Sequence, residues 1–310
     1  MVLRVFLLAT LAALCSQGAD NPGVRIAARP ARPKPDTVPA NLRVDVKLVL
    51  IPVTVTDLFG APFKGLTQTA FRLLENGIEQ KIKYFSAEEA PVSLGLIFDA
   101  SRSMEGKLDE SRAAVSHVFH TALPKDEYFV VEFSDAPRLL CPFTNDTKRI
   151  EKSLTGIAPR NWTALLDAIY LGIQQMQRAR NSRKALLILS DGGDNSSRYT
   201  ESEMRSLVRE ADVCIYSIAL VGGGLMRRHV PLLKHLAAET GGRVYEVEKM
   251  TELPEAVEKL SEAIRHQYLL GYSSNDGRNT GLYRKVEVRL EQPARTPRLR
   301  ASWRTGYYTP

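Results

Sequence analysis

An apolar segment that ends in a cluster of oxygen-bearing side chains constrains the fold of this chain more than any other feature. Residues 92–98 have the length and composition of a buried strand, and Asp99, Ser101 and Ser103 follow at every second position. A helical pattern over residues 104–123 comes next. Ligand sites collect at this end of the strands in open α/β sheets. Carboxylate and hydroxyl oxygens favour Mg²⁺, Mn²⁺ or Ca²⁺ over softer metals, so we expect a divalent-cation site here.

Two later segments carry similar groups in similar positions. Residues 184–190 form a second apolar run of strand length, and Asp191 follows it directly. Thr163 stands where a loop enters a second helical pattern, over residues 163–179. These positions predict that both side chains join the first cluster at one edge of a sheet.

A simpler interpretation of the first cluster is helix capping. Ser101 and Ser103 have hydroxyls suited to cap a helix that begins at Met104. A lone Asp-x-Ser-x-Ser would favour that interpretation, whereas the three segments together favour the metal site.

The set resembles the metal-ion-dependent adhesion site (MIDAS) of von Willebrand factor A (VWA) domains, in which Asp-x-Ser-x-Ser precedes a loop Thr and then an Asp that ends a later strand. The resemblance implies hydroxyl ligands from the serines and the threonine, and carboxylates that bind directly or through water. The five implied ligands are Asp99, Ser101, Ser103, Thr163 and Asp191. This chain differs from the usual pattern at Trp162, where a small residue is expected before the threonine.

From residue 91 the sequence alternates between strand and helix patterns, which predicts a doubly wound, mostly parallel, Rossmann-like sheet. The predicted strands span 92–98, 128–134, 137–143, 185–190, 213–220 and 243–247. The predicted helices span 104–123, 163–179, 201–211, 229–240 and 252–266. Only a short turn separates the second and third strands, so we expect that pair to be antiparallel. We assign residues 91–265 to a VWA domain.

The segments on either side of this domain have β patterns and too few residues to form a core alone. Residues 42–88 contain short alternating runs and the hairpin signal Asn76-Gly77, and residues 267–310 contain three more runs. We therefore expect the two segments to form one small antiparallel β-sandwich into which the VWA domain is inserted. The order of these flanking motifs resembles an exported bacterial VWFA-related family, of acidobacterial type.

The first forty residues have the pattern of a targeting signal followed by a linker. One basic residue, an apolar stretch to Leu14 and small residues after it are typical of a signal peptide, which we place at residues 1–19. Residues 20–40 are a proline-rich linker. No other stretch is long and apolar enough for a transmembrane segment. We therefore expect an exported protein, periplasmic or extracellular.

The charge pattern and the motifs argue against two classes of function, nucleic-acid binding and catalysis. The net charge is +7, but the C-terminal basic residues alternate with apolar ones, as in half-buried strands, and no nucleic-acid motif accompanies them. We also find no nucleophile elbow or phosphate-binding loop, and we predict that the chain is not an enzyme. Two alternatives stay open for the loop of Asp194, Asn195, Ser196 and Ser197, which either forms a second cation site or caps the next helix.

The resemblance implies a binding role. A MIDAS ion, most often Mg²⁺, keeps one coordination position for an Asp or Glu carboxylate of a protein partner. The leading hypothesis is an exported, metal-dependent, adhesion-type binding module. A structural scaffold of the cell envelope that assembles through the β-sandwich is the first alternative, and a metal-dependent hydrolase is the second.

Overall fold

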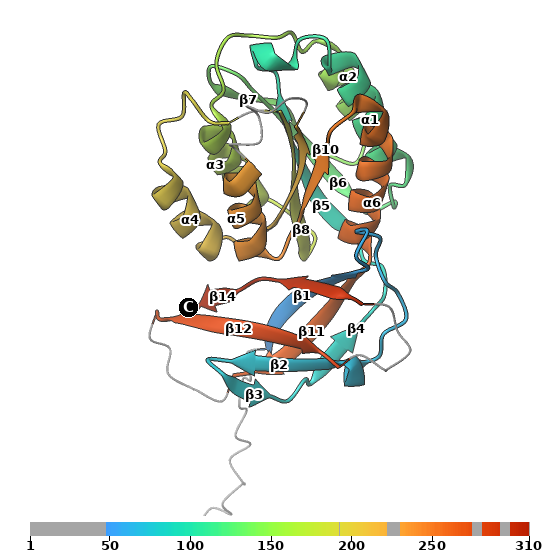
Figure 1. The fold of residues 1–310 in the computed structure, drawn as a ribbon, viewed down its shortest axis with the longest axis vertical. Helices are drawn as coiled ribbons and strands as arrows, with labels where there is room; N and C mark the ends of the chain where they lie inside the picture. Colours follow the sequence, from blue (N-terminus) through green and yellow to red (C-terminus); the bar gives the residue numbers. More distant parts are fainter. Residues whose placement is uncertain (1–47, 192, 222–229, 275–280, 292–297, 310) are drawn as a thin grey trace, which may run out of the picture. The chain divides into compact units, whose positions relative to one another are not determined.

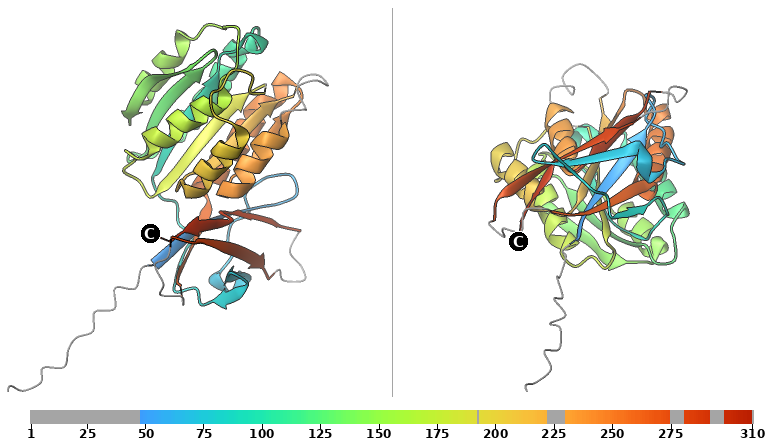
Figure 2. Two further views of the ribbon diagram at one scale, coloured as in Figure 1. Left: turned by 90° about the vertical axis from the view of Figure 1, so that its left-hand side faces the viewer. Right: turned by 90° about the horizontal axis from the view of Figure 1, so that it is seen from below.

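The computed structural model describes residues 48–191, 193–221, 230–274, 281–291 and 298–309. Its α/β part is a six-stranded sheet, and helices cover both faces of that sheet (Figures 1 and 2). The strands are β5 (Val92–Asp99), β6 (Glu127–Phe133), β7 (Pro137–Thr144), β8 (Arg183–Ser190), β9 (Cys214–Leu220) and β10 (Val244–Val247). Their spatial order is β10-β9-β8-β5-β6-β7, parallel throughout except for the antiparallel β6–β7 pair.

The helices form two groups around this sheet. They are α1 (Leu108–His120), α2 (Thr147–Thr155), α3 (Leu165–Met176), α4 (Glu201–Glu210), α5 (Val230–Thr240) and α6 (Leu253–Arg265). Apolar side chains of α1, α2 and α6 pack in one core on one face, and those of α3, α4 and α5 pack in a second core on the other. Strands buried on both faces need continuous apolar runs, as β5 and β8 have.

The remaining strands form two four-stranded sheets, ordered β13-β1-β11-β4 and β14-β12-β2-β3. These strands are β1 (Leu48–Thr56), β2 (Phe71–Glu75), β3 (Ile78–Gln80), β4 (Tyr84–Ser86), β11 (Gln267–Ser273), β12 (Tyr283–Leu290), β13 (Arg300–Trp303) and β14 (Gly306–Tyr308). Three short 3₁₀ turns, η1 (Gln68–Ala70), η2 (Arg102–Met104) and η4 (Met250–Glu252), complete the described elements. Every pairing is antiparallel, and a third apolar core contains side chains from both sheets.

The predicted fold class is confirmed, because strands from both flanking segments share sheets around an inserted α/β domain. The antiparallel β6–β7 pair and the Asn76-Gly77 turn are also as predicted, with positive φ at both turn residues. The predicted segments 1–19 and 20–40 lie outside the described residues. None of the helices in the described ranges is long and apolar enough to cross a membrane.

Some element boundaries differ from the prediction. Two segments expected to be single strands, 80–86 and 298–307, each turn from one sheet to the other. The first divides between β3 and β4, and the second between β13 and β14. Pro52 lies in β1, which is an inner strand between β13 and β11. The pairing with β13 begins only at Val53, so the side of Pro52 that lacks an N–H needs no partner.

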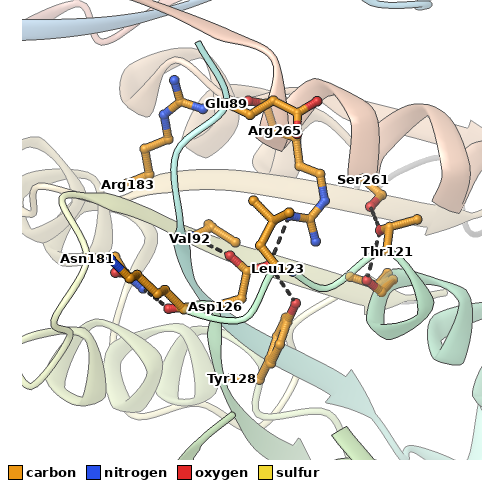
Figure 3. A network of polar contacts seen from close by, with 12 residues as sticks. Glu89, Val92, Thr121, Leu123, Asp126, Tyr128, Asn181, Arg183, Ser261 and Arg265 are labelled. Atoms are coloured by element: carbon orange, nitrogen blue, oxygen red, sulfur yellow. Dashed lines mark hydrogen bonds and ion pairs between the residues drawn. The ribbon is translucent and has the colours of Figure 1, made fainter.

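A buried polar network holds the chain where it enters and leaves the α/β part (Figure 3). Asp126 accepts hydrogen bonds from the backbone of Val92 and from Arg265, at 2.9 Å each. Arg183, at the start of β8, donates to the carbonyl oxygens of Glu88, Arg265 and Gln267, residues close to these two connections. The network therefore fixes the start of β5, whose other end carries the candidate site.

Candidate metal centre

The predicted ligands come from three loops at one edge of the six-stranded sheet. Asp99 is the last residue of β5, and Asp191 directly follows β8, the parallel neighbour of β5. Ser101 and Ser103 lie in the turn after β5, and Thr163 lies just before α3. All are buried except Ser103, which is partly buried.

Hydrogen bonds connect four of the five side chains. Asp99 Oδ1 accepts from the backbone N–H of Ser101 at 2.7 Å, and the hydroxyls of Ser101 and Ser103 lie 3.0 Å apart. Ser103 Oγ in turn donates to Asp191 Oδ1 at 2.6 Å. Neither serine caps a helix, because the Ser101 side chain makes no capping bond and α1 begins only at Leu108.

Thr163 is held through its backbone to the loop that follows Asp191. Its N–H donates to Asn195 Oδ1 at 2.8 Å, and its carbonyl oxygen accepts from the N–H of Asn195 at 3.0 Å. Three residues earlier, the Arg160 N–H donates to the carbonyl oxygen of Ala100 at 2.8 Å. The Thr163 hydroxyl makes no hydrogen bond to another described residue, which leaves its oxygen free to bind a ligand.

The Asp99 carboxylate is buried, and its hydrogen-bond donors among the described residues are neutral. Burial raises the pKa of Asp99 to about 6, against the lowering effect of hydrogen bonds from Ser101 and Ser190, and the charge of Asp191 raises it further. Within the described ranges, no basic side chain pairs with Asp99. A buried anion without a counter-charge is costly in free energy. The residues present therefore fit a hard divalent cation.

Sequence reasoning missed two side chains at this site. Ser190 donates to Asp99 Oδ2 at 2.5 Å. Lys107, which precedes α1, donates its ammonium group to Asp191 Oδ2 and forms an ion pair with it. A lysine immediately before a helix is an unusual choice that signals a role outside the helix, because Ser, Thr, Asp or Asn is preferred there.

The loop after Asp191 supports a neighbouring helix. Asp194 accepts from the N–H of Leu166 at 3.3 Å, and the N–H of Asp167 donates to Ser197 Oγ at 3.1 Å. The loop thus caps α3, the preceding helix, whereas Thr200 caps the following one, α4. Among the described residues, no three His, Cys, Asp or Glu side chains are grouped to hold a metal, so the candidate centre depends on hydroxyl ligands.

Three exposed side chains lie on the loops that carry the ligands. Arg102 stands between the two serines, and Arg160 and Trp162 lie on the Thr163 loop. Trp162 is 58% exposed, while its backbone N–H is held by Asp135 Oδ1 at 2.9 Å. Neither arginine side chain forms a hydrogen bond or ion pair with a described residue. We refer to Arg102, Arg160 and Trp162 as the rim.

Comparisons with known proteins identify the domain that carries these residues. A family model described as the von Willebrand factor type A domain matches residues 94–193, which include all five predicted ligands. A search of curated protein sequences finds no significant match.

Two solved structures show the same fold at low sequence identity. One is a point mutant of the PilB minor pilin from Streptococcus sanguinis, with a TM-score of 0.50, 13% identity, and coverage of 57% of this chain and 62% of that one. The other is proximal thread matrix protein 1 from the mussel byssus with a zinc-occupied MIDAS motif, with a TM-score of 0.50, 15% identity, and coverage of 61% and 49%. The match thus spans about half to three fifths of those chains. Together with the family match, the sheet order and its helices establish that this chain contains a von Willebrand factor type A domain.

Proposed function

We propose that this chain is an exported binding protein whose VWA domain holds a divalent cation and uses it to bind a carboxylate of a protein partner. The proposed ligands are Asp99, Ser101, Ser103, Thr163 and Asp191, and the proposed ion is Mg²⁺, with Mn²⁺ or Ca²⁺ as substitutes. The proposed boundaries are a signal peptide at 1–19, a linker at 20–40, the VWA domain at 91–265 and sandwich segments at 42–88 and 267–310.

The buried Asp99 carboxylate is the observation that carries this proposal. Its hydrogen-bond donors among the described residues are all neutral, and it lies at the end of β5 next to the strand that Asp191 follows. A divalent cation between two carboxylates and three hydroxyls offsets the cost of burying both charges. Five protein oxygens leave one position of an octahedral ion for a ligand from outside, such as a partner's carboxylate.

The rim suggests the character of the partner. Arg102 and Arg160 would add positive charge to the face that carries the cation and would attract an acidic segment. Exposed tryptophan and arginine are the residues that most often contribute large binding energies at interfaces. We therefore propose a partner loop with an Asp or Glu ligand, further acidic residues beside it and an apolar side chain that packs on Trp162.

Calorimetric titration of the purified chain with Mg²⁺, Mn²⁺, Ca²⁺ and Zn²⁺ tests the site. We expect binding by the wild-type protein and a loss of at least tenfold in affinity in Thr163→Val, which removes one hydroxyl ligand. Thr155→Val is a matched control, because Thr155 is exposed at the end of α2. Absence of divalent-cation binding at millimolar concentrations would overturn the proposal and leave the scaffold alternative.

One observation favours the scaffold alternative. Leu50, Gly271 and Tyr84 are cross-strand neighbours in one sheet, and Leu50 and Tyr84 are both partly exposed, as is the nearby Leu48. This apolar strip is a surface through which copies or partners would assemble. The oligomeric state of wild-type protein and of Leu50→Glu, measured by light scattering, distinguishes a scaffold from a monomeric binding module.

A further inference from the structure

The ion pair between Lys107 and Asp191 gives the candidate metal centre a positive charge of its own. Asp191 has a fully buried side chain, one oxygen of which accepts from Ser103 and the other from the Lys107 ammonium. A divalent cation bound to the same carboxylate would lie close to the ammonium group, and the two positive charges would repel each other. The lysine and the cation therefore compete for one group.

The position of Lys107 argues that this contact has a purpose. Lys107 is the residue before α1, and the N-terminal end of a helix carries a partial positive charge that disfavours a lysine there. Its side chain makes no capping bond to the helix. Gly106, with φ of +79°, turns the chain just before it, so the lysine points toward Asp191 at the expense of a better capping residue. Violations of local preference of this kind concentrate at functional sites.

The side chain also has a route away from the site. Lys107 is 25% exposed, whereas its partner is completely buried. The four-carbon stem of a lysine is flexible and its ammonium group is strongly hydrated, so the charge can move into water when a cation arrives.

We propose that Lys107 is a tethered counter-ion, which neutralises Asp191 in the cation-free protein and must leave it when a divalent cation binds. This inference rests on the proposed metal site and adds a control on its affinity. The cation-free domain remains stable because the buried carboxylate keeps a partner. The cation affinity is correspondingly lower than the five oxygens alone would give.

Three variants test the competition by calorimetric titration with Mn²⁺ and Mg²⁺. Lys107→Met keeps the length of the side chain without the charge, and we expect it to tighten binding at least tenfold. Lys107→Arg offers a planar, bidentate donor to the carboxylate, so we expect binding several-fold weaker than in the wild type. Lys234→Met makes the same substitution at an exposed lysine that pairs with Glu246 instead of with a candidate ligand, and we expect a change of less than threefold.

A second readout is thermal unfolding in chelator. Lys107→Met is expected to unfold at a lower temperature than the wild type there, and to recover when Mn²⁺ is added. Equal or weaker binding by Lys107→Met, or a tightening matched by Lys234→Met, would overturn the inference. Should Lys107→Met fail to fold in chelator, the wild-type and Lys107→Arg affinities decide, and equal values would overturn it.

The outcomes also separate this inference from the proposed function. Cation binding by Lys107→Met alone would support the tethered counter-ion and overturn metal-dependent binding by the natural chain. Cation binding by the wild type that is unchanged in the Lys107 variants would support metal binding by the natural chain and overturn the tethered counter-ion. Absence of binding in every variant would overturn both.

Discussion

Two buried carboxylates in this molecule have opposite surroundings. Glu75, in the sandwich, accepts hydrogen bonds from Arg284 at 2.8 Å and from Tyr272 at 2.5 Å, with Ser274 and Tyr307 as further donors. Burial acts to raise the pKa of Glu75, but these four donors together hold it below its usual value. Asp99, in the VWA domain, has no charged donor in the part of the chain that the structure describes, and burial raises its pKa to about 6.

This difference separates a structural network from a binding site. The Glu75 network is complete, so its charge stabilises the fold wherever the carboxylate is ionised. Asp99 has a buried negative charge and no basic partner among the described residues, so it destabilises the cation-free fold at neutral pH. A cation that binds to such a site removes this destabilisation, whereas a complete network gains no comparable stabilisation from a ligand.

The largest expected effect comes from breaking the complete network. Arg284→Met leaves Glu75 buried without its cation, and removal of one partner from a buried ion pair costs about 3–5 kcal/mol. Urea denaturation measures this as a fall in the free energy of unfolding. Arg289→Met is the matched control, because Arg289 lies on the same strand in an exposed pair with Glu287 and should cost less than about 1 kcal/mol. Similar losses in both variants would show that the Glu75 network is not special.

The second largest expected effect is a gain in stability, on removal of the Asp99 charge. In chelator at pH 7, Asp99→Asn should raise the free energy of unfolding by up to about 3 kcal/mol, the equivalent of a pKa of about 6 against the ordinary 3.8. Because the folded pKa is raised, Asp99 costs nothing below pH 3.8, and its cost appears as pH rises through 6. The gain from Asp99→Asn should therefore vanish near pH 4.

The contribution of Glu75 to the free energy of unfolding should depend on pH in the opposite direction. Its folded pKa is lowered, so its contribution is present above its ordinary pKa of 4.5 and is lost as pH falls through the folded value. Unfolding of the wild type, Asp99→Asn and Glu75→Gln between pH 4 and 8 compares the two. Asp109→Asn controls for a lost surface charge. A loss of stability in Asp99→Asn at pH 7 would contradict the interpretation of Asp99.

The two regions also differ in how far the sequence predicts them. The candidate ligands follow local rules, because Asp99 and Asp191 each end an apolar run and adjacent parallel strands bring such ends together. The Glu75 network joins residues about 200 positions apart, and Glu75 itself precedes an ordinary hairpin turn. Only the register of β12 against β2 brings Arg284 within reach, and no single-sequence pattern sets that register.

Two further misses have local causes. Helix α2 buries only Ile150 and Leu154, so its apolar pattern is too sparse to predict, although Asp146 caps it. Lys107 is visible in the sequence as a poor capping residue, but its direction depends on the turn at Gly106 and on the position of Asp191 after β8. Sequence patterns thus identify the ligand loops, whereas partners from other strands need the folded chain.

The smallest expected effect tests whether the Glu75 network depends on each donor. Tyr307→Phe removes one hydroxyl that donates to Glu75 Oε2 at 2.8 Å and leaves the ring in place. Glu75 keeps three donors, including Arg284, so we expect a loss of about 1 kcal/mol in urea denaturation, typical of one hydrogen bond. Tyr308→Phe is the matched control, because this neighbouring ring is partly exposed and its hydroxyl makes no hydrogen bond to a described residue. A loss as large as that of Arg284→Met would mean that the hydroxyls, rather than the guanidinium charge, keep Glu75 ionised.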